Sequence, residues 1–84
     1  MINLKTKKVE IDGVAFEVKE LTPRVVLPLM EGEPDNLAIE IAKLSVHVNG
    51  KPIGEPILDM GFGAFNKLIN AVTEINGLGD QGND

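Results

Sequence analysis

The sequence contains no cysteine, no tryptophan and no tyrosine, and it has one histidine, His47. The absence of cysteine excludes disulfide bonds, thiolate nucleophiles and thiolate metal ligands. A zinc site usually needs three or four ligands from Cys, His, Asp and Glu, and a Ser-His-Asp arrangement would depend on His47 alone. Because His47 stands between Val46 and Val48, we expect it to be structural or superficial. We therefore predict a protein that is not an enzyme and holds no metal or cofactor.

No segment approaches the ~20 apolar residues that a membrane-spanning helix requires. The sequence begins at Met1 without a following apolar stretch, so we expect a complete chain that carries no secretory signal. The net charge of −5 opposes binding to nucleic-acid phosphates. The basic cluster Lys5–Lys8 is followed at once by Glu10 and Asp12, which favours a solvated strand face. We predict that neither a membrane nor a nucleic acid is a partner.

The length of 84 residues suits one domain, and the apolar fraction of 43% is that of an ordinary globular protein. We predict a single domain over residues 1–78 and a short disordered tail over residues 79–84, which are polar and rich in glycine. A core of this size supplies roughly 3–5 kcal/mol of stability. Self-association or the binding of a partner would supplement it.

Two segments near the start, Lys7–Ile11 and Val14–Lys19, alternate between polar and apolar residues, as half-buried strands do. Asp12 and Gly13 between them tolerate the positive φ angles of a tight type I′ turn. The pattern predicts an antiparallel β-hairpin with one apolar face. A lone hairpin is marginal in water, so this face should pack on the elements that follow.

A first helix is predicted from Thr22 and Pro23, with the Thr22 hydroxyl accepting a hydrogen bond at the N-cap. Pro28 cannot donate to the helical ladder, so this helix should be short or bent. A second helix should begin between residues 34 and 36 and end near Val46. Its apolar stripe is predicted to comprise Leu37, Ile41, Leu44 and Val48.

Asn49 and Gly50 are a strong turn signal that allows two structures. They can end the second helix, or they can join two very short extended segments. The glycines and prolines of residues 50–56 argue against a helix there. The last helix is predicted from the apolar spacing between Phe62 and Ile75, and it should stop at Asn76 and Gly77. The predicted fold is α+β, a hairpin followed by three helices (ββααα) on one face of a small sheet.

A hairpin this short has little area to cover three apolar helix faces, so apolar surface should remain exposed. Exposed apolar surface often marks a site of protein–protein interaction. We expect it on the first helix and at the start of the last helix. The predicted partner-binding residues are Val25, Val26, Leu29, Phe62 and Phe65.

Four segments, in this order and spacing, together resemble the tail assembly chaperones of tailed bacteriophages and prophages. The similarity spans residues 7–78, nearly the whole chain, and is carried by the hairpin Lys8–Val18, the helix start Glu20–Arg24, the stretch Leu44–Gly54 and the final helix Leu68–Leu78. The resemblance implies a protein of the host cytoplasm that binds the tape-measure protein, keeps it soluble and helps to recruit tail-tube subunits. It also implies a protein that is absent from the mature virion and that can self-associate.

Other classes of protein remain open at this level. A small structural protein of the virion tail or neck is one alternative, although a tail-tube subunit should be longer and mostly β. A small regulatory protein-binding module is another. If such a module bound DNA it would need a basic reading helix, and the predicted helices are acidic or neutral.

Overall fold

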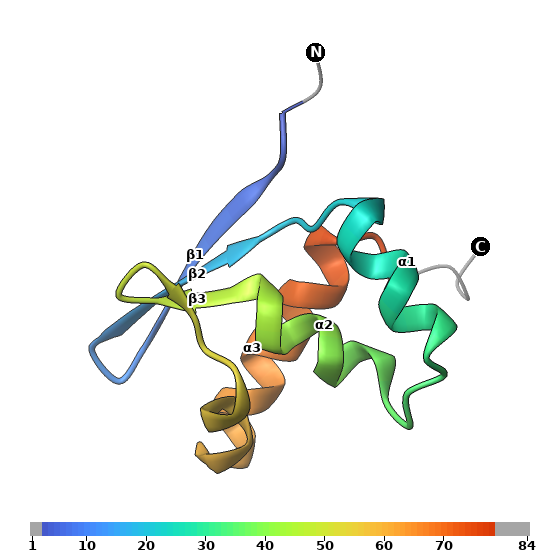
Figure 1. Ribbon diagram of the computed structural model, residues 1–84. Coiled ribbons are helices and arrows are strands. Elements are labelled where there is room, and N and C mark those ends of the chain that lie inside the picture. Colours follow the sequence, from blue (N-terminus) through green and yellow to red (C-terminus); the bar gives the residue numbers. More distant parts are fainter. Residues whose placement is uncertain (1–2, 79–84) are drawn as a thin grey trace, which may run out of the picture.

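The computed structural model describes residues 3–78, and Figure 1 shows their arrangement. An N-terminal pair of strands is followed by two helices, a second pair of very short strands, a 3₁₀ helix and a final helix. The elements are β1 (Thr6–Ile11), β2 (Val14–Lys19), α1 (Pro23–Glu31), α2 (Leu37–Ser45), β3 (Val46–Val48), β4 (Lys51–Pro52), η1 (Glu55–Asp59) and α3 (Phe62–Ile75). The predicted α+β class, the N-terminal hairpin and the three α-helices are confirmed.

The four strands form one antiparallel sheet in the order β1-β2-β3-β4. The first hairpin turns at Asp12 and Gly13, whose φ angles are 52° and 81°. The second turns at Asn49 and Gly50, whose φ angles are 55° and 81°. Both pairs have the positive φ values of type I′ turns. Of the two structures that the sequence allowed for residues 46–53, the pair of extended segments is therefore the one formed.

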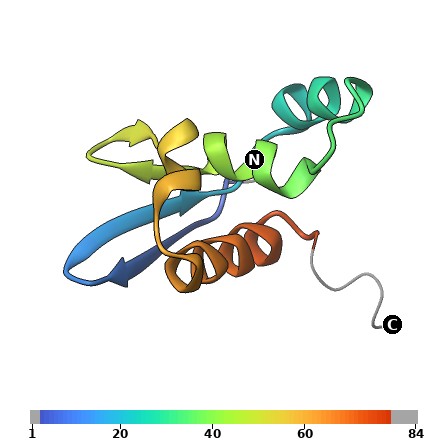
Figure 2. The same cartoon turned by 90° about the horizontal axis from the view of Figure 1, so that it is seen from below.

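The core lies between one face of the sheet and the helices α2 and α3 (Figure 2). α3 packs against β1, β2 and α2, whereas α1 packs mainly on α2, at the end of the molecule away from the hairpin turns (Figures 1 and 2). Ten apolar residues are buried in this core: Ile11, Phe16, Val18, Ile41, Ala42, Val46, Ile57, Leu68, Ala71 and Val72. The elements that bring them together come from both halves of the chain.

α1 begins at Pro23 after Thr22, as predicted, but the Thr22 side chain makes no capping hydrogen bond. The amides of Val25 and Val26 donate instead to the backbone carbonyl of Thr22, at 3.0 Å each. The prediction of a hydroxyl cap was therefore wrong. Helix α1 is short and continues through Pro28, because proline lacks an amide proton but does not prevent its neighbours from keeping helical angles.

In α2, Asn36 caps the start, and its Oδ1 accepts a hydrogen bond from the Ile39 amide at 3.2 Å. The predicted apolar stripe is only partly right. Leu44 is 38% exposed, and Val48 belongs to β3. The helix turns Ile41, Ala42 and Ser45 inward instead. The small side chains at two of these positions permit a close approach to the core, and the Ser45 hydroxyl donates to the Lys19 carbonyl.

The segment after β4 forms a 3₁₀ helix, η1, which the prolines and glycines had argued against. Pro56 is tolerated because it lies in the first turn of η1, where amide protons need no helical partner. η1 buries Ile57 in the core. It also leads into α3, so its position determines what surrounds the first turn of that helix.

α3 starts after Gly61 and ends at Asn76 and Gly77, as predicted, and Gly77 has a φ of 72°. The Asn76 side chain joins three segments. Its Oδ1 accepts from the Leu21 amide at 2.8 Å, and its Nδ2 donates to the Val72 carbonyl at 3.0 Å and to Ser45 Oγ at 3.5 Å. The tail predicted at residues 79–84 lies outside the described residues. Within residues 3–78, no helix is long and apolar enough to cross a membrane.

Candidate partner-binding surfaces

The described part of the chain brings few metal-binding or potentially catalytic side chains together. Among residues 3–78, no three His, Asp or Glu side chains lie close enough together to hold a metal ion. His47 is half-buried in β3, and its Nδ1 lies 3.2 Å from the carbonyl oxygen of Ser45. The features that stand out are hollows and exposed apolar side chains on the helices.

An apolar hollow lies where α2, η1 and α3 meet, and we call it the Phe62 cleft. It encloses about 270 Å³. Phe62, in the first turn of α3, is 76% exposed, and its ring centroid lies 6.2 Å from that of Phe65, with the planes inclined by 18°. All of its lining residues are apolar: Ile39, Ile57, Leu58, Met60, Phe62 and Phe65. Together with the hollow, the exposed Phe62 ring makes a contiguous apolar surface, which is the kind that often marks an interaction site.

η1 is fastened to α2 beside this cleft by an ion-pair cluster. Lys43 Nζ donates to Glu55 Oε2 at 2.7 Å and to Glu40 Oε2 at 3.4 Å. The hydrogen bond to Glu55 raises the pKa of Lys43 above its ordinary value, against a lowering effect of desolvation, and Glu40 adds to the rise. The Gly54 amide also donates to the Lys43 carbonyl at 3.0 Å. The cluster therefore holds one wall of the Phe62 cleft in place.

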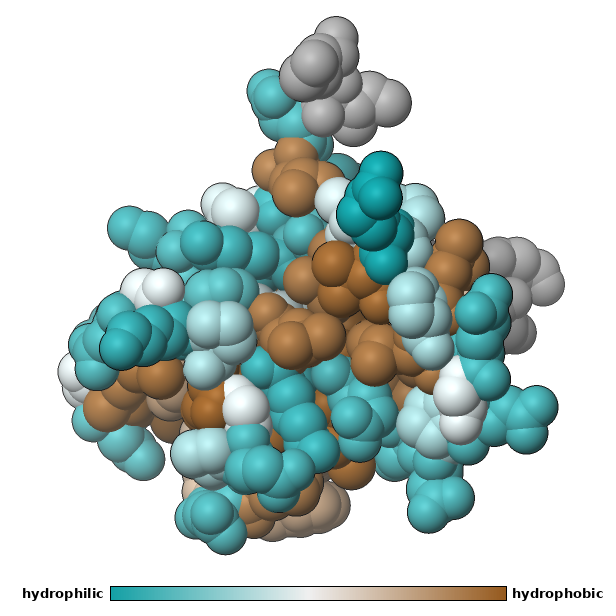
Figure 3. Space-filling model, viewed as in Figure 1, coloured by the Kyte–Doolittle hydropathy of each residue, from teal (hydrophilic) through white to brown (hydrophobic). Residues whose placement is uncertain are grey.

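A second apolar region, the α1 surface, consists of Val25, Val26, Leu27, Leu29 and Met30. Helix α1 contains no buried residue. Val26 and Leu29 are half-buried beside the core, whereas Leu27 and Met30 are 53% and 49% exposed. Next to them a hollow of about 320 Å³ separates α1 from α2 and the end of α3. Figure 3 shows brown side chains gathered over α1 and its junction with α2, framed by teal ones.

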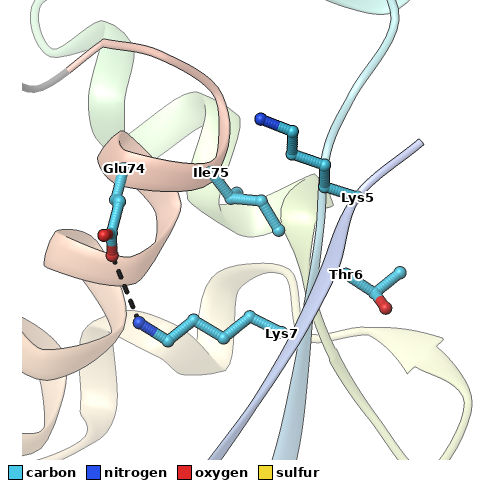
Figure 4. A pocket seen from close by; sticks show the side chains of 5 residues that line it. All are labelled: Lys5, Thr6, Lys7, Glu74 and Ile75. Atoms are coloured by element: carbon cyan, nitrogen blue, oxygen red, sulfur yellow. Dashed lines mark hydrogen bonds and ion pairs between the residues drawn. The ribbon is translucent and has the colours of Figure 1, made fainter. Parts of the chain in front are cut away.

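A third hollow, of about 370 Å³, lies between β1 and the last turn of α3 (Figure 4). Lys7 and Glu74 point toward one another across it, and Lys7 Nζ lies 3.2 Å from Glu74 Oε1. Ile75 extends into the same gap from α3. This hollow has a mixed lining and is spanned by an ion pair, so it joins the hairpin to α3 and offers less apolar surface than the Phe62 cleft.

The five predicted contact residues thus fall on two separate surfaces. Phe62 and Phe65 lie together in the Phe62 cleft, and Val25, Val26 and Leu29 lie on α1. The two surfaces adjoin opposite ends of α3, which are about 20 Å apart along a helix of this length. Whether a partner touches any of these residues stays a prediction.

Several residues of these surfaces were not foreseen from the sequence. Ile39, Leu58 and Met60 complete the Phe62 cleft, and Leu27 and Met30 are the most exposed apolar residues of α1. Leu58 and Met60 were missed because η1 was taken for an irregular loop. Leu27 could have been found by noting that Val26 and Leu29 occupy the inner side of α1, which leaves the opposite side in solvent, and Met30 lies at the edge of the inner side.

Comparison with models of protein families, with curated proteins and with solved structures gives no match. What the chain does is therefore inferred from the surfaces described above and from the sequence resemblance.

Proposed function

We propose that this protein is a non-catalytic assembly chaperone of bacteriophage tails. In this role it binds the tape-measure protein in the host cytoplasm, keeps it soluble and helps to bring tail-tube subunits to it, and it is absent from the mature virion. The sequence resemblance over residues 7–78 supports the proposal, as does the α+β fold with two exposed apolar surfaces.

The observation that carries the proposal is the exposure of Phe62 at an apolar cleft. All six side chains that line the cleft are apolar, whereas sites for small molecules carry a few precisely placed polar groups. The cleft suits one or two large side chains that project from a partner. Amphipathic helices dock in this way, with apolar anchors one turn apart in a hydrophobic groove. An unpacked tape-measure protein would present such anchors along its length.

The charge around the cleft agrees with a chaperone that must keep an apolar partner in solution. Glu55 and Asp59 of η1 are exposed beside the apolar lining, and the whole chain carries a net charge of −5. Excess charge of one sign opposes association of the complexes with one another. The apolar floor and the acidic rim therefore serve binding and solubility separately.

The proposal is tested by co-expressing this protein with the long coiled-coil protein that the proposal expects a neighbouring gene to encode, its tape-measure partner. We expect the wild-type chain to keep the tape-measure protein in the soluble fraction and to co-purify with it. Phe62→Ser should abolish both effects, because it removes the exposed anchor. The substitution should leave the melting temperature nearly unchanged, since Phe62 buries little of its surface.

Leu27→Ser is the matched control, because it removes an exposed apolar side chain from α1, 53% exposed against 76% for Phe62, and should leave this binding intact. If the folded Phe62→Ser variant still solubilised the tape-measure protein, the cleft would not be the binding site. If the wild-type chain neither bound nor solubilised that protein, the proposed function itself would be wrong.

A further inference from the structure

The side of α1 that faces solvent has a simple charge pattern. Val26 and Leu29 point toward the core, and the residues on the opposite side are Arg24, Leu27, Pro28 and Glu31, all exposed. At helical spacing these four residues form one stripe, with a positive charge at its start, two apolar side chains in its middle and a negative charge at its end.

Both charges are placed unfavourably for an isolated helix. Arg24 lies in the first turn of α1 and Glu31 is its last residue, and the helix has no acid in its first turn and no base in its last. The helix dipole favours the reverse arrangement. Among residues 3–78, no ion pair includes Arg24 or Glu31.

We propose that α1 is a self-association surface, on which the α1 helix of a second copy packs in antiparallel orientation. In that arrangement a two-fold axis passes near Leu27 and Pro28, which pack on their counterparts. Arg24 of each copy then lies opposite Glu31 of the other, so the stripe is complementary to itself, as a two-fold symmetric interface requires.

The second copy also reverses the unfavourable dipole interactions. The partner's Glu31 comes close to the N-terminal end of α1, where a negative charge is stabilising. The partner's Arg24 comes close to the C-terminal end, where a positive charge is stabilising. A parallel pair would instead bring like charges together at both ends, so the charge pattern favours the antiparallel pair alone.

The size of the surface indicates a reversible dimer. A helix of nine residues is about 14 Å long, so two such helices bury less than the ~800 Å² per partner of a standard stable interface. Leu27, at 53% exposure, and the exposed Pro28 supply the apolar part, and Val25 and Met30 flank it. We therefore expect monomer and dimer to exchange, with the dimer favoured at high concentration.

Sedimentation equilibrium over a wide concentration range, at physiological ionic strength, tests the proposal by charge reversal. Arg24→Glu and Glu31→Arg should each weaken the dimer at least about five-fold, because both ion pairs of the interface become like-charge contacts. The double variant should restore the wild-type dimer. An equimolar mixture of the two single variants should form a heterodimer, since all its charge pairs are again opposite.

Matched controls distinguish an effect of reversing a charge on α1 from an effect of the change in net charge. Lys51→Glu and Glu10→Arg change the net charge as the two reversals do, at exposed positions on the sheet, and should leave the dimer constant nearly unchanged. Leu27→Ser should weaken the dimer at least about ten-fold, because it removes apolar contact from both copies. Phe62→Ser should have no effect on it.

A wild-type chain that is monomeric at every concentration would overturn the proposal. A dimer whose dissociation constant is the same in the wild type and in the α1 variants would also overturn it. Heterodimers from the mixed single variants that are tighter than the wild-type dimer, with no weakening in either single variant, would establish a parallel pair and overturn the antiparallel one. The proposal does not depend on the tape-measure protein, because the measurement uses this chain alone.

Discussion

α1 and α3 are both rich in apolar residues, yet the two helices are held in different ways. α3 buries Leu68, Ala71 and Val72 and packs against β1, β2 and α2. α1 buries no residue and packs mainly on α2, at one end of the molecule. The difference shows that apolar composition does not decide burial. A helix is buried when the sheet lies beneath it, and α1 begins where the sheet has already ended.

The largest effect that separates the two helices is expected from truncating a leucine in each. Leu68→Ala should lower the free energy of unfolding by about 2–5 kcal/mol, because it opens a cavity in the core. Leu29→Ala, at a half-buried position of α1, should lower the free energy of unfolding by only about 1 kcal/mol. Urea denaturation of both variants measures the two values. Equal losses would mean that α1 belongs to the same cooperative core as α3.

A medium effect is expected at the link between the two helices. Asn76→Ala removes the side chain that accepts the hydrogen bond from the Leu21 amide, just before α1. The amide is partly buried, so leaving it unpaired should cost about 1–3 kcal/mol. Hydrogen exchange should show the largest loss of protection in α1 and the Leu21 amide. Loss confined to α3 would contradict the role of Asn76 as a tether.

The smallest effect is expected at η1. Ion pairs of Lys43 fix η1 to α2, whereas no ion pair among residues 3–78 includes a residue of α1. Lys43→Met should lower the melting temperature slightly and loosen η1 beside the Phe62 cleft. The folded-state pKa of Lys43 is raised, chiefly by Glu55, so its contribution is full below the unfolded value of ~10.4. The contribution is lost as the pH rises through the folded-state pKa.

Thermal melts of the wild-type chain and of Lys43→Met, from neutral to strongly alkaline pH, measure this difference. The two melting temperatures should differ at neutral pH and converge above the folded-state pKa. A difference that persisted unchanged at the alkaline end would show that Lys43 acts through the packing of its alkyl chain, and its charge would then have no part in holding η1.

Local patterns in the sequence predicted most of the secondary structure. The Asp12-Gly13 turn, the start of α1 at Pro23 and the stop of α3 at Asn76 each depend on a few adjacent residues. The second hairpin could not be chosen in advance, because Asn49-Gly50 also suits a helix end. Its formation depends on pairing with β2, where Glu17 lies opposite His47 in a contact distant in sequence.

The candidate surfaces were predictable in kind but only partly in position. The exposed apolar residues of α3 and α1 followed from a short hairpin that cannot cover three helix faces. The Phe62 cleft required the position of η1, which brings Leu58 and Met60 beside Ile39. The error in the predicted apolar stripe of α2 has a similar cause. The core accepts Ala42 and Ser45 because β2 and α3 come close there, and Leu44 turns outward.

The Lys7–Glu74 pair and the Leu21–Asn76 bond have a consequence for biosynthesis. Both join the first elements of the chain to the last turn of α3. About 55 residues lie between Phe16 and Val72, so at 5–20 residues per second a ribosome needs roughly 3–11 s to supply the helix that covers the hairpin. During that interval α3 does not yet cover the newly synthesised hairpin, and a chaperone or a neighbouring nascent chain can bind to its apolar face.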